Sequence, residues 1–478
     1  MAGLQGVNQI VARHGRHALL LTALCLGGCA TSVFNPVSNV PLKGDVSPDM
    51  GSHTDIVGPD VIALSFSGGG LRAAAFAHGA LRALQETRTA DGDLLDDITL
   101  LSSVSGGSLV SAYWGVYGRD GLADFRQEVL LRDYERDMRL SILNPRNFMR
   151  LLGGGLNDRS NFSAVLDDKV FKGATFSDIY QHSRADVRIN ATDLYHRISF
   201  PFIPRVFSLL CSDIRPYKVA DAVAASMAVP LVFAPVVLQS YSDHCIEPPP
   251  AWIEQTRNDP HAPRLFAAAA NGIASYRDPN RTRYIKLVDG GITDNLGLST
   301  LLITRALLGT PHAPLTERDA VRIRQMLFVV VDSGLGPRGD WTWQPNGPDG
   351  VDYALSSTDA AIDASSRFAA DSFARMVQDM QRDTIAFRCQ LPATEVLRLR
   401  GTLDGWRCDD VKFEVELLSF ASFDPATRKR LDAIPTRLTL TEEQVDTAIK
   451  AGEEGMRHLP SLQRYLARRA QSIATAPH

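Results

Sequence analysis

The chain has 478 residues, and its 50 Lys and Arg residues against 54 Asp and Glu residues give a formal net charge of −4. This near balance argues against a nucleic-acid-binding protein, whose binding domain is normally basic. Apolar residues make up 45% and charged residues 22% of the sequence, which excludes disordered and fibrous classes. The length is sufficient for a large core and for two or three domains.

The N-terminus has the pattern of an export signal. Arg13 and Arg16 precede an apolar run at 18–26, which is too short to span a bilayer but suits the core of a signal peptide. The run ends in the sequence LGGC at positions 26–29, which resembles the lipobox of bacterial lipoproteins. The alternative is a plain signal peptide with an incidental Cys29.

These features predict that residues 1–28 are a lipoprotein signal peptide and that Cys29 carries the lipid. The residue after Cys29 is Ala30 and not Asp, which resembles the pattern sorted to the outer membrane. We therefore expect a lipoprotein of the bacterial cell envelope, held at a membrane by its anchor. Residues 29–59 are rich in Pro, Ser, Gly and Asp and lack periodicity, which predicts a flexible tether.

Short apolar runs alternate with helical patterns from residue 60 onward. Five strands are predicted, at 61–66, 98–104, 187–191, 284–288 and 326–331. Helices are predicted after the first two of these strands, at 71–85 and 109–117. Strands separated by helices predict a mostly parallel sheet covered on both faces, that is, a three-layer α/β/α domain over 60–470. Functional residues are then expected at the carboxyl ends of the strands.

Two later regions depart from this alternation. Residues 240–280 contain Pro-rich stretches without clear periodicity and are interpreted as an insertion, and whether it forms a lid stays open. Residues 359–470 are predicted to form a C-terminal helical extension. This extension contains a helix at 359–382, a strand at 411–420 and a capping box at 441–444 that opens another helix.

Four cysteines follow the N-terminal segment, namely Cys211, Cys245, Cys389 and Cys408. Export to an oxidising compartment permits disulfides, and four cysteines allow three connectivities. We favour Cys211–Cys245 and Cys389–Cys408, because the members of each pair are close in sequence. The chain contains no C-x-x-C or H-E-x-x-H spacing, so neither a metal site nor a cofactor is predicted.

A glycine run follows the first predicted strand and precedes its helix. Gly68, Gly69 and Gly70 allow a ligand to approach the backbone closely, and the helix N-terminus adds unpaired N–H groups, which suits an oxyanion or a phosphate. Gly68, Gly70 and Ala73 also satisfy the dinucleotide fingerprint. That interpretation requires an acidic residue about 20 positions on, after the second strand, where this chain has Ser105. A purely structural glycine turn stays open.

Ser105 lies between the second predicted strand and its helix, within the sequence SVSGG at 103–107. A strained strand-to-helix turn of type G-x-S-x-G exposes a serine hydroxyl at the top of a sheet, and small residues flank the serine because the chains crowd there. Ser103 replaces the first glycine of that pattern. The alternative is an ordinary turn rich in Ser and Gly.

A serine nucleophile needs a base at neutral pH. The histidines that follow Ser105 have no clear strand-end or glycine-flanked setting; they include His182, His196, His244, His261, His312 and His458. Asp289, by contrast, follows an apolar strand and precedes two glycines, Gly290 and Gly291. An aspartate that only turns the chain is the structural alternative.

The combination of a glycine run before Arg72, a serine elbow and Asp-Gly-Gly, in that order, resembles the patatin-like phospholipase family. Three further segments support the resemblance: 190–194 (NATDL), 225–235 (ASMAVPLVFAP) and 289–295 (DGGITDN). The resemblance extends from residue 61 to about residue 332. Ala73 and Ser103 depart from it, since the family more often has glycine at both positions.

The resemblance implies a Ser–Asp dyad that hydrolyses acyl esters of phospholipids or other lipids without a histidine. Ser105 is then the nucleophile, Asp289 is the base, and the backbone N–H groups of Gly68, Gly69 and Gly70 form the oxyanion hole. Arg72 either orients the glycine loop or faces the lipid phosphate. Three carboxylates are ranked lower as bases because they lack the Asp-Gly-Gly setting: Asp193, Asp294 and Asp332.

Two other functions remain in view. A Ser-His-Asp lipase or thioesterase would use one of the downstream histidines as base. A non-catalytic lipid-binding envelope lipoprotein would keep the scaffold without turnover, although both dyad residues are present in this chain.

Overall fold

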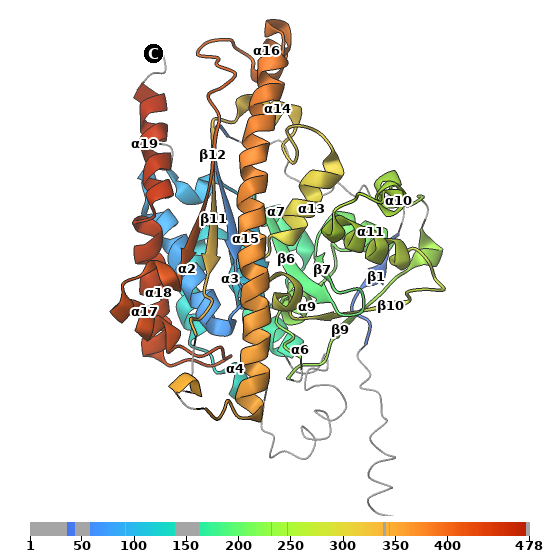
Figure 1. The fold of residues 1–478 in the computed structure, drawn as a ribbon, viewed down its shortest axis with the longest axis vertical. Coiled ribbons are helices and arrows are strands. Elements are labelled where there is room, and N and C mark those ends of the chain that lie inside the picture. The colour runs from blue at the N-terminus through green and yellow to red at the C-terminus, as the bar shows by residue number, and fades with distance from the viewer. Residues whose placement is uncertain are drawn as a thin grey trace, which may run out of the picture.

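A computed structural model describes residues 36–43, 58–90, 92–138, 162–230, 232–245, 247–337, 341–343 and 345–474. Its centre is an eight-stranded sheet (Figure 1). Seven strands follow the order β12-β11-β2-β5-β6-β10-β9, and the eighth, β7, pairs with the carboxyl-terminal half of β6. The strands from β12 to β6 are parallel, whereas β7, β9 and β10 are antiparallel to their neighbours. The mostly parallel α/β sheet is as predicted.

Six of the eight strands lie where apolar runs predicted them, whereas β7 and β9 were not predicted from the sequence. Their bounds are β2 (Asp60–Phe66), β5 (Ile98–Val104), β6 (Asp186–Asp193), β7 (Ile198–Pro201), β9 (Val236–Gln239), β10 (Tyr284–Val288), β11 (Gln325–Asp332) and β12 (Lys412–Ser419). All seven residues of β2 are buried, because this strand lies inside the sheet with helices on both faces.

Successive residues of β2 face two separate cores, which establishes the three layers. Ile62, Leu64 and Phe66 pack into the core that holds α2 (Gly70–Glu86), α3 (Gly106–Phe125) and α18 (Glu442–Arg457). Val61 and Ala63 pack into the opposite core with α13 (Ser299–Leu308) and the long α15 (Gly350–Gln390). This alternation follows from the two-residue period of a strand.

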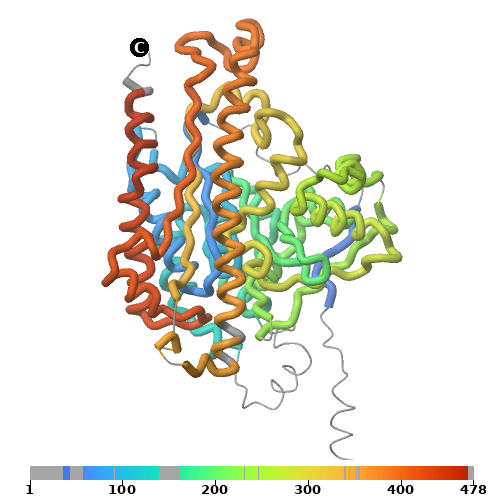
Figure 2. Tube along the Cα trace, in the orientation of Figure 1, coloured from blue at the N-terminus to red at the C-terminus, as the bar shows by residue number. Residues whose placement is uncertain are grey.

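The other helices connect these elements or cover their edges. They are α4 (Tyr134–Asp137), α6 (Phe162–Leu166), α7 (Phe176–His182), α8 (Pro204–Leu209), α9 (Val219–Ser226), α10 (Ala251–Asn258), α11 (Arg264–Tyr276), α12 (Gly291–Asp294), α14 (Glu317–Arg322), α16 (Ala393–Arg400), α17 (Pro425–Asp432) and α19 (Pro460–Ala474). The colour gradient along the chain shows the C-terminal helices beside the N-terminal half of the domain (Figure 2). The most extensive packing between two of these elements is that of α18 against α2.

The prediction of a flexible tether over residues 29–59 is wrong for residues 36–43, which lie on the domain. Strand β1 (Val40–Pro41) pairs with β8 (Ser212–Asp213), and Val37 forms a bridge with Val237. Asn39 is buried and exchanges hydrogen bonds with the backbone of Gln239, as donor at 2.9 Å and as acceptor at 2.8 Å. These satisfied polar groups hold a segment that has no hydrophobic periodicity.

The C-terminal region is not a helical extension of the predicted kind, because its strand belongs to the central sheet. β12 pairs in parallel with β11 along its whole length, so residues 359–470 complete the domain. The predicted helix at 359–382 is longer at both ends, as α15. The capping box opens α18 as predicted, since the Thr441 hydroxyl accepts the backbone N–H of Gln444 and the Gln444 amide oxygen accepts that of Thr441.

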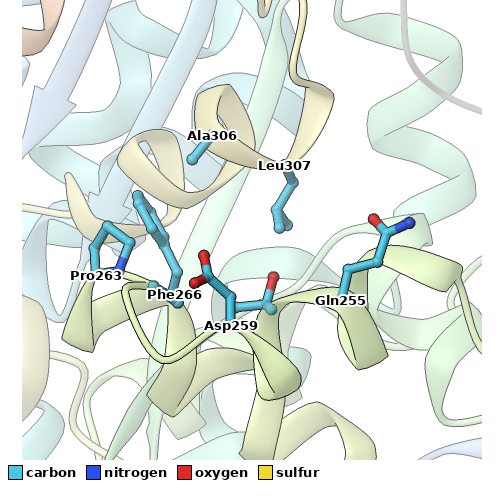
Figure 3. A pocket seen from close by; sticks show the side chains of 8 residues that line it. Gln255, Asp259, Pro263, Phe266, Ala306 and Leu307 are labelled. Carbon is cyan, nitrogen blue, oxygen red and sulfur yellow. The ribbon is translucent and has the colours of Figure 1, made fainter.

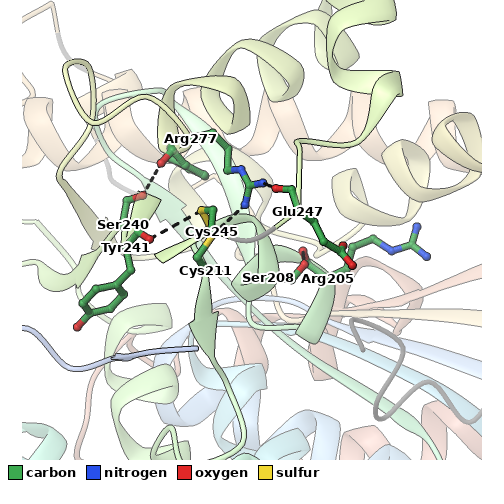
Figure 4. The surroundings of a disulfide bond; sticks show 9 residues. Arg205, Ser208, Cys211, Ser240, Tyr241, Cys245, Glu247 and Arg277 are labelled. Carbon is green, nitrogen blue, oxygen red and sulfur yellow. Dashed lines mark hydrogen bonds between the residues drawn. A yellow bond between two sulfur atoms is a disulfide. The ribbon is translucent and has the colours of Figure 1, made fainter. Parts of the chain in front are cut away.

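Both predicted disulfides form, Cys211–Cys245 and Cys389–Cys408. The first joins the end of α8 to the start of the insertion, which occupies the connection between β9 and β10 and contains α10 and α11. Beside it, Arg277 donates to the sulfur of Cys211 at 2.7 Å (Figure 4). The insertion is thereby fixed to the body of the domain at its first residues.

The predicted signal peptide at 1–28 and the predicted lipid attachment at Cys29 lie outside the described residues. Within the described part of the chain, no helix has the length and apolar character needed to cross a bilayer.

Candidate active site

Ser105 occupies a tight turn at the carboxyl edge of the sheet, between β5 and α3. Its backbone has φ 50° and ψ −123°, a conformation that side-chain-bearing residues rarely adopt, and its N–H donates to the Ser226 hydroxyl at 2.8 Å. A side chain at Gly106 would overlap the carbonyl of Gly70, and one at Gly107 would crowd β2. The turn therefore requires small residues after the serine, as a strained nucleophile elbow does.

Asp289 follows β10 and meets this turn from the other side. The Ser105 hydroxyl donates to Asp289 Oδ2 at 2.9 Å, and the backbone N–H of Gly291 donates to Oδ1 at 2.8 Å. The Asp289 backbone N–H donates to the carbonyl of Ala228 at 2.9 Å, which fixes the turn after the strand. Two side chains that are 184 positions apart in the sequence are thus in hydrogen-bond contact.

The environment of Asp289 favours proton uptake. Ser105 is 6% and Asp289 8% exposed, and burial raises the pKa of Asp289 from 3.8 to about 6. The hydrogen bonds from Gly291 and Ser105 act in the opposite direction and lower this pKa. The carboxylate is therefore a stronger base than an exposed aspartate, while it stays mostly ionised at neutral pH.

The glycine loop lies against the Ser105 turn, but its three amides are not equivalent. The Gly68 N–H donates to the Asn295 carbonyl at 3.1 Å, so the prediction that this amide binds an oxyanion is wrong. The N–H groups of Gly69 and Gly70 have no hydrogen-bond partner among the described residues, nor does that of Gly106 at the start of α3. Gly69 and Gly70 have φ values of 140° and 61°, which glycine adopts without strain.

Arg72 points into the protein, away from solvent. It is 3% exposed, donates to the Ile434 carbonyl at 2.9 Å and lies over the ring of Phe420. Leu71, the residue before Arg72, contacts the same C-terminal segment, because its N–H donates to the carbonyl of Arg437 at 3.0 Å. The loop-orienting role is the alternative that this geometry favours, and the lipid-phosphate role lacks an exposed guanidinium.

The three carboxylates ranked lower as bases all hold backbone or internal partners. Asp294 caps the start of α13, accepting the N–H of Ser299 at 2.7 Å, and burial raises its pKa to about 6. Asp332 accepts the N–H of Gly334 at 2.9 Å, and burial raises its pKa as well. Asp193 accepts hydrogen bonds within a separate cluster. None of the three has a hydrogen bond to the Ser105 hydroxyl.

The structure contains a Ser-His-Asp chain, although on another serine. His196 lies between Asp193 Oδ2 and the Ser275 hydroxyl, at 2.6 Å from each. Ser275 is 2% exposed inside α11 and lies 2.7 Å from the Gly272 carbonyl, so this hydroxyl faces the protein interior. Over the part of the chain that the structure describes, no histidine ring forms a hydrogen bond with Ser105 or its carboxylate partner.

Two supporting features escaped prediction from the sequence. The Ser226 hydroxyl accepts the Ser105 N–H and lies 2.6 Å from the Asn190 carbonyl, so it joins the elbow to β6. Ser226 lies in the family-like stretch 225–235, which was a signal for its importance but not for its partner. The second feature is the segment 434–437, whose carbonyls hold the glycine loop and for which the sequence offers no signal.

A small pocket of ≈ 200 Å³ lies elsewhere, between the insertion and α13 (Figure 3). Gln255, Asp259 and Phe266 line one side, and Ala306 and Leu307 the other. None of its lining residues belongs to the Ser105 site. Among the described residues, no group of three or more His, Cys, Asp or Glu side chains is arranged to hold a metal.

Comparison with protein families gives one match. The family model described as patatin-like phospholipase matches residues 64–302, which is half of the chain and includes both Ser105 and Asp289. No curated protein matches the sequence.

Solved structures give remote similarity. Human GIVD cytosolic phospholipase A2 is 12% identical, with a TM-score of 0.38, over 91% of this chain and 68% of that one. The same human enzyme in complex with methyl gamma-linolenyl fluorophosphonate and terbium chloride is 13% identical, with a TM-score of 0.38, over 91% and 66% of the two chains. The chain thus spans about two thirds of the length of these structures.

Proposed function

The chain belongs to the patatin-like phospholipase family, and on that premise we propose that it hydrolyses lipid acyl esters with Ser105 as nucleophile and Asp289 as general base. The observation that carries this proposal is the 2.9 Å hydrogen bond from the Ser105 hydroxyl to Asp289 Oδ2. The proposed substrates are phospholipids or other lipid esters. No cofactor is required, because a serine hydroxyl, a carboxylate and backbone amides supply each step.

In the first half-reaction, the Ser105 oxygen attacks the ester carbonyl carbon while its proton passes to Asp289. The negative charge that develops on the carbonyl oxygen is stabilised by the unpaired N–H groups of Gly69, Gly70 and Gly106. When the tetrahedral intermediate collapses, the protonated Asp289 donates its proton to the leaving alcohol. The product is an acyl ester of Ser105.

In the second half-reaction, a water molecule attacks the acyl ester and gives its proton to Asp289. The same amides stabilise the second oxyanion, and the Ser105 oxygen recovers its proton as the fatty acid leaves. A carboxyl with a pKa of about 6 suits both directions of transfer, since it accepts a proton in the attack and releases it in the collapse. No histidine takes part.

Active-site labelling and matched substitutions test this function. Ser105→Ala and Asp289→Asn should each abolish hydrolysis of a short-chain soluble ester, and a fluorophosphonate should label wild-type protein at Ser105. His196→Gln is the matched control, because it removes the contact between a histidine and the buried Ser275, away from Ser105, and should keep turnover. Turnover by folded Asp289→Asn protein would refute the dyad. Absence of labelling and turnover in folded wild type would favour a non-catalytic lipid-binding lipoprotein.

We also propose that Cys29 carries a lipid anchor and that the protein belongs to the bacterial cell envelope, at the outer membrane. The support is the order of basic residues, apolar run and LGGC sequence at positions 26–29. Metabolic labelling with a radioactive fatty acid should mark the wild-type chain and not Cys29→Ala protein. Wild-type protein that carries no label would refute the anchor.

A further inference from the structure

The described chain enters the fold beside the active site. Val37 forms a parallel bridge with Val237, and the Ser38 N–H donates to the Val237 carbonyl at 3.1 Å. Parallel pairing of these residues puts Pro36 next to Val236, where β9 begins. The position of Pro36 is therefore fixed by the sheet.

The sheet register then gives the distance from this entry point to the dyad. Val236 pairs with Leu287 on β10, and Asp289 follows two residues later. Two strand spacings of about 4.8 Å and two residue steps of about 3.3 Å separate Pro36 from Asp289 by about 12 Å. The N-terminal chain thus leaves the domain at the edge of the catalytic site.

Exposed apolar side chains lie in the segment between Ala228, which contacts Asp289, and β9, and in the turn just after Asp289. Val229 is 43%, Val232 40% and Ile292 40% exposed, and Pro230 is exposed too. We call these four residues the apolar rim. The rim is attached to the site on both sides, because the carbonyl just before Val229 accepts the Asp289 N–H at 2.9 Å and Ile292 lies three residues after Asp289. Exposed apolar side chains that adjoin a catalytic residue on both sides suit an interaction surface.

The number of residues between Cys29 and Pro36 limits how far the domain can lie from the anchored residue. Seven residue steps separate Cys29 from Pro36, and a chain covers at most about 3.6 Å per step, so Pro36 lies within about 25 Å of the anchored residue in any conformation. A tether over the whole of 29–59 would impose no such limit. The binding of residues 36–43 to the domain is what shortens it.

We propose that the apolar rim docks on the surface of the same bilayer that holds the lipid at Cys29, so that Ser105 faces that membrane. This inference rests on the proposed function and on the proposed anchor. Valine, isoleucine and proline enter the interface favourably, and lipid esters then reach the elbow without crossing bulk water. The strands β11 and β12 run downward in Figure 1, so the carboxyl ends of the parallel strands face the lower part of the domain, whereas α16 lies at its upper end.

Vesicle assays with the full mature chain test the docking surface. Hydrolysis of phosphatidylethanolamine–phosphatidylglycerol vesicles is compared with hydrolysis of a soluble short-chain ester for Val229→Glu and Val232→Glu proteins. The vesicle-to-soluble ratio should fall about tenfold, since each change puts a charge where an apolar side chain meets lipid. The matched control is Leu397→Glu on α16, where the leucine is 48% exposed, and its ratio should stay at the wild-type value.

A second assay tests the short anchor. Wild-type protein reconstituted in vesicles should hydrolyse the lipids of its own vesicle in preference to those of added protein-free vesicles, and Cys29→Ala should remove the preference. The proposal is overturned if the rim variants keep the wild-type ratio, if Leu397→Glu lowers the ratio equally, or if Cys29→Ala keeps the preference. Failure of the proposed function is recognised separately, by Ser105→Ala protein that still hydrolyses the soluble ester.

Discussion

Replacing Asp289 by Asn should abolish catalysis and, at alkaline pH, stabilise the fold. Burial raises the pKa of Asp289 from 3.8 to about 6, which corresponds to about 3 kcal/mol of unfavourable free energy for the ionised form. Because the folded state binds this proton more tightly than the unfolded state, the carboxyl favours folding below pH 3.8. That contribution is lost as the pH rises through about 6, so at pH 8 the folded wild type carries the full penalty.

Asparagine has the shape of aspartate and still accepts the Gly291 N–H, but it carries no charge to desolvate. The pKa of about 6 already includes the hydrogen bonds from Gly291 and Ser105, so the variant should be more stable than wild type at pH 8 by up to about 3 kcal/mol. At pH 4 the wild-type carboxyl is mostly protonated in the folded protein, so the difference should be small. Urea unfolding of both proteins at pH 4, 6 and 8 measures this trend.

The control for this series is Asp120→Asn, a change at an exposed position on α3. The difference in free energy of unfolding between this variant and wild type should be nearly the same at all three pH values. The reasoning is refuted if Asp289→Asn is less stable than wild type at pH 8 while it matches wild type at pH 4. It is also refuted if the variant's advantage is the same at all three pH values, because desolvation of a charge then cannot be its cause. A general base placed in a dry site is thus expected to cost stability in return for proton affinity.

Three further outcomes follow from the site. The value of kcat/KM for a soluble ester should fall about tenfold per pH unit below about pH 6, where Asp289 becomes protonated, and a flat profile down to pH 4 would contradict its role as base. Arg72→Gln should lower kcat by about 10²-fold and change KM little, with partial recovery in Arg72→Lys, because the guanidinium holds the oxyanion loop; a change confined to KM would instead point to substrate contact. His196→Gln should keep kcat/KM within about twofold while it lowers the free energy of unfolding by about 1–3 kcal/mol, and loss of activity in the folded variant would revive a histidine-dependent mechanism.

The sequence alone predicted those elements whose local residue pattern follows from their burial in the fold. β2 and β5 are rich in apolar residues because helices cover both faces of the sheet, and such a run is recognisable without knowledge of its neighbours. Ser105 and Asp289 were found for a related reason. Ser105 follows β5, and Asp289 follows β10, an apolar strand interrupted by the exposed Lys286. Both residues precede glycines, and the ends of these two strands come together.

Prediction failed where a contact is made by backbone atoms. The Gly68 amide is engaged by the Asn295 carbonyl and the Gly106 amide is not engaged by any described residue, a distinction that no side chain encodes. Asn39 seats the N-terminal segment through hydrogen bonds to one residue 200 positions away, in a stretch whose composition is that of a linker. Amino-acid composition indicates only the average tendency of a segment to be flexible. A single buried amide side chain can hold such a segment in place when both of its polar groups form hydrogen bonds.

The proposed catalytic unit of this chain extends beyond the segment that the family model matches. The family match ends at residue 302, whereas β11 lies between β2 and β12 inside the sheet. The carbonyls of Ile434 and Arg437 hold the glycine loop that is proposed to supply oxyanion donors. Without β11, the fully buried β2 would become an open edge with unpaired backbone groups, which is unfavourable. Without the segment at 434–437, Arg72 would lose the acceptor for its buried guanidinium, and the glycine loop would lose its fixed position. The proposed nucleophile and base therefore come from the first two thirds of the chain, and the geometry that places them depends on the last third.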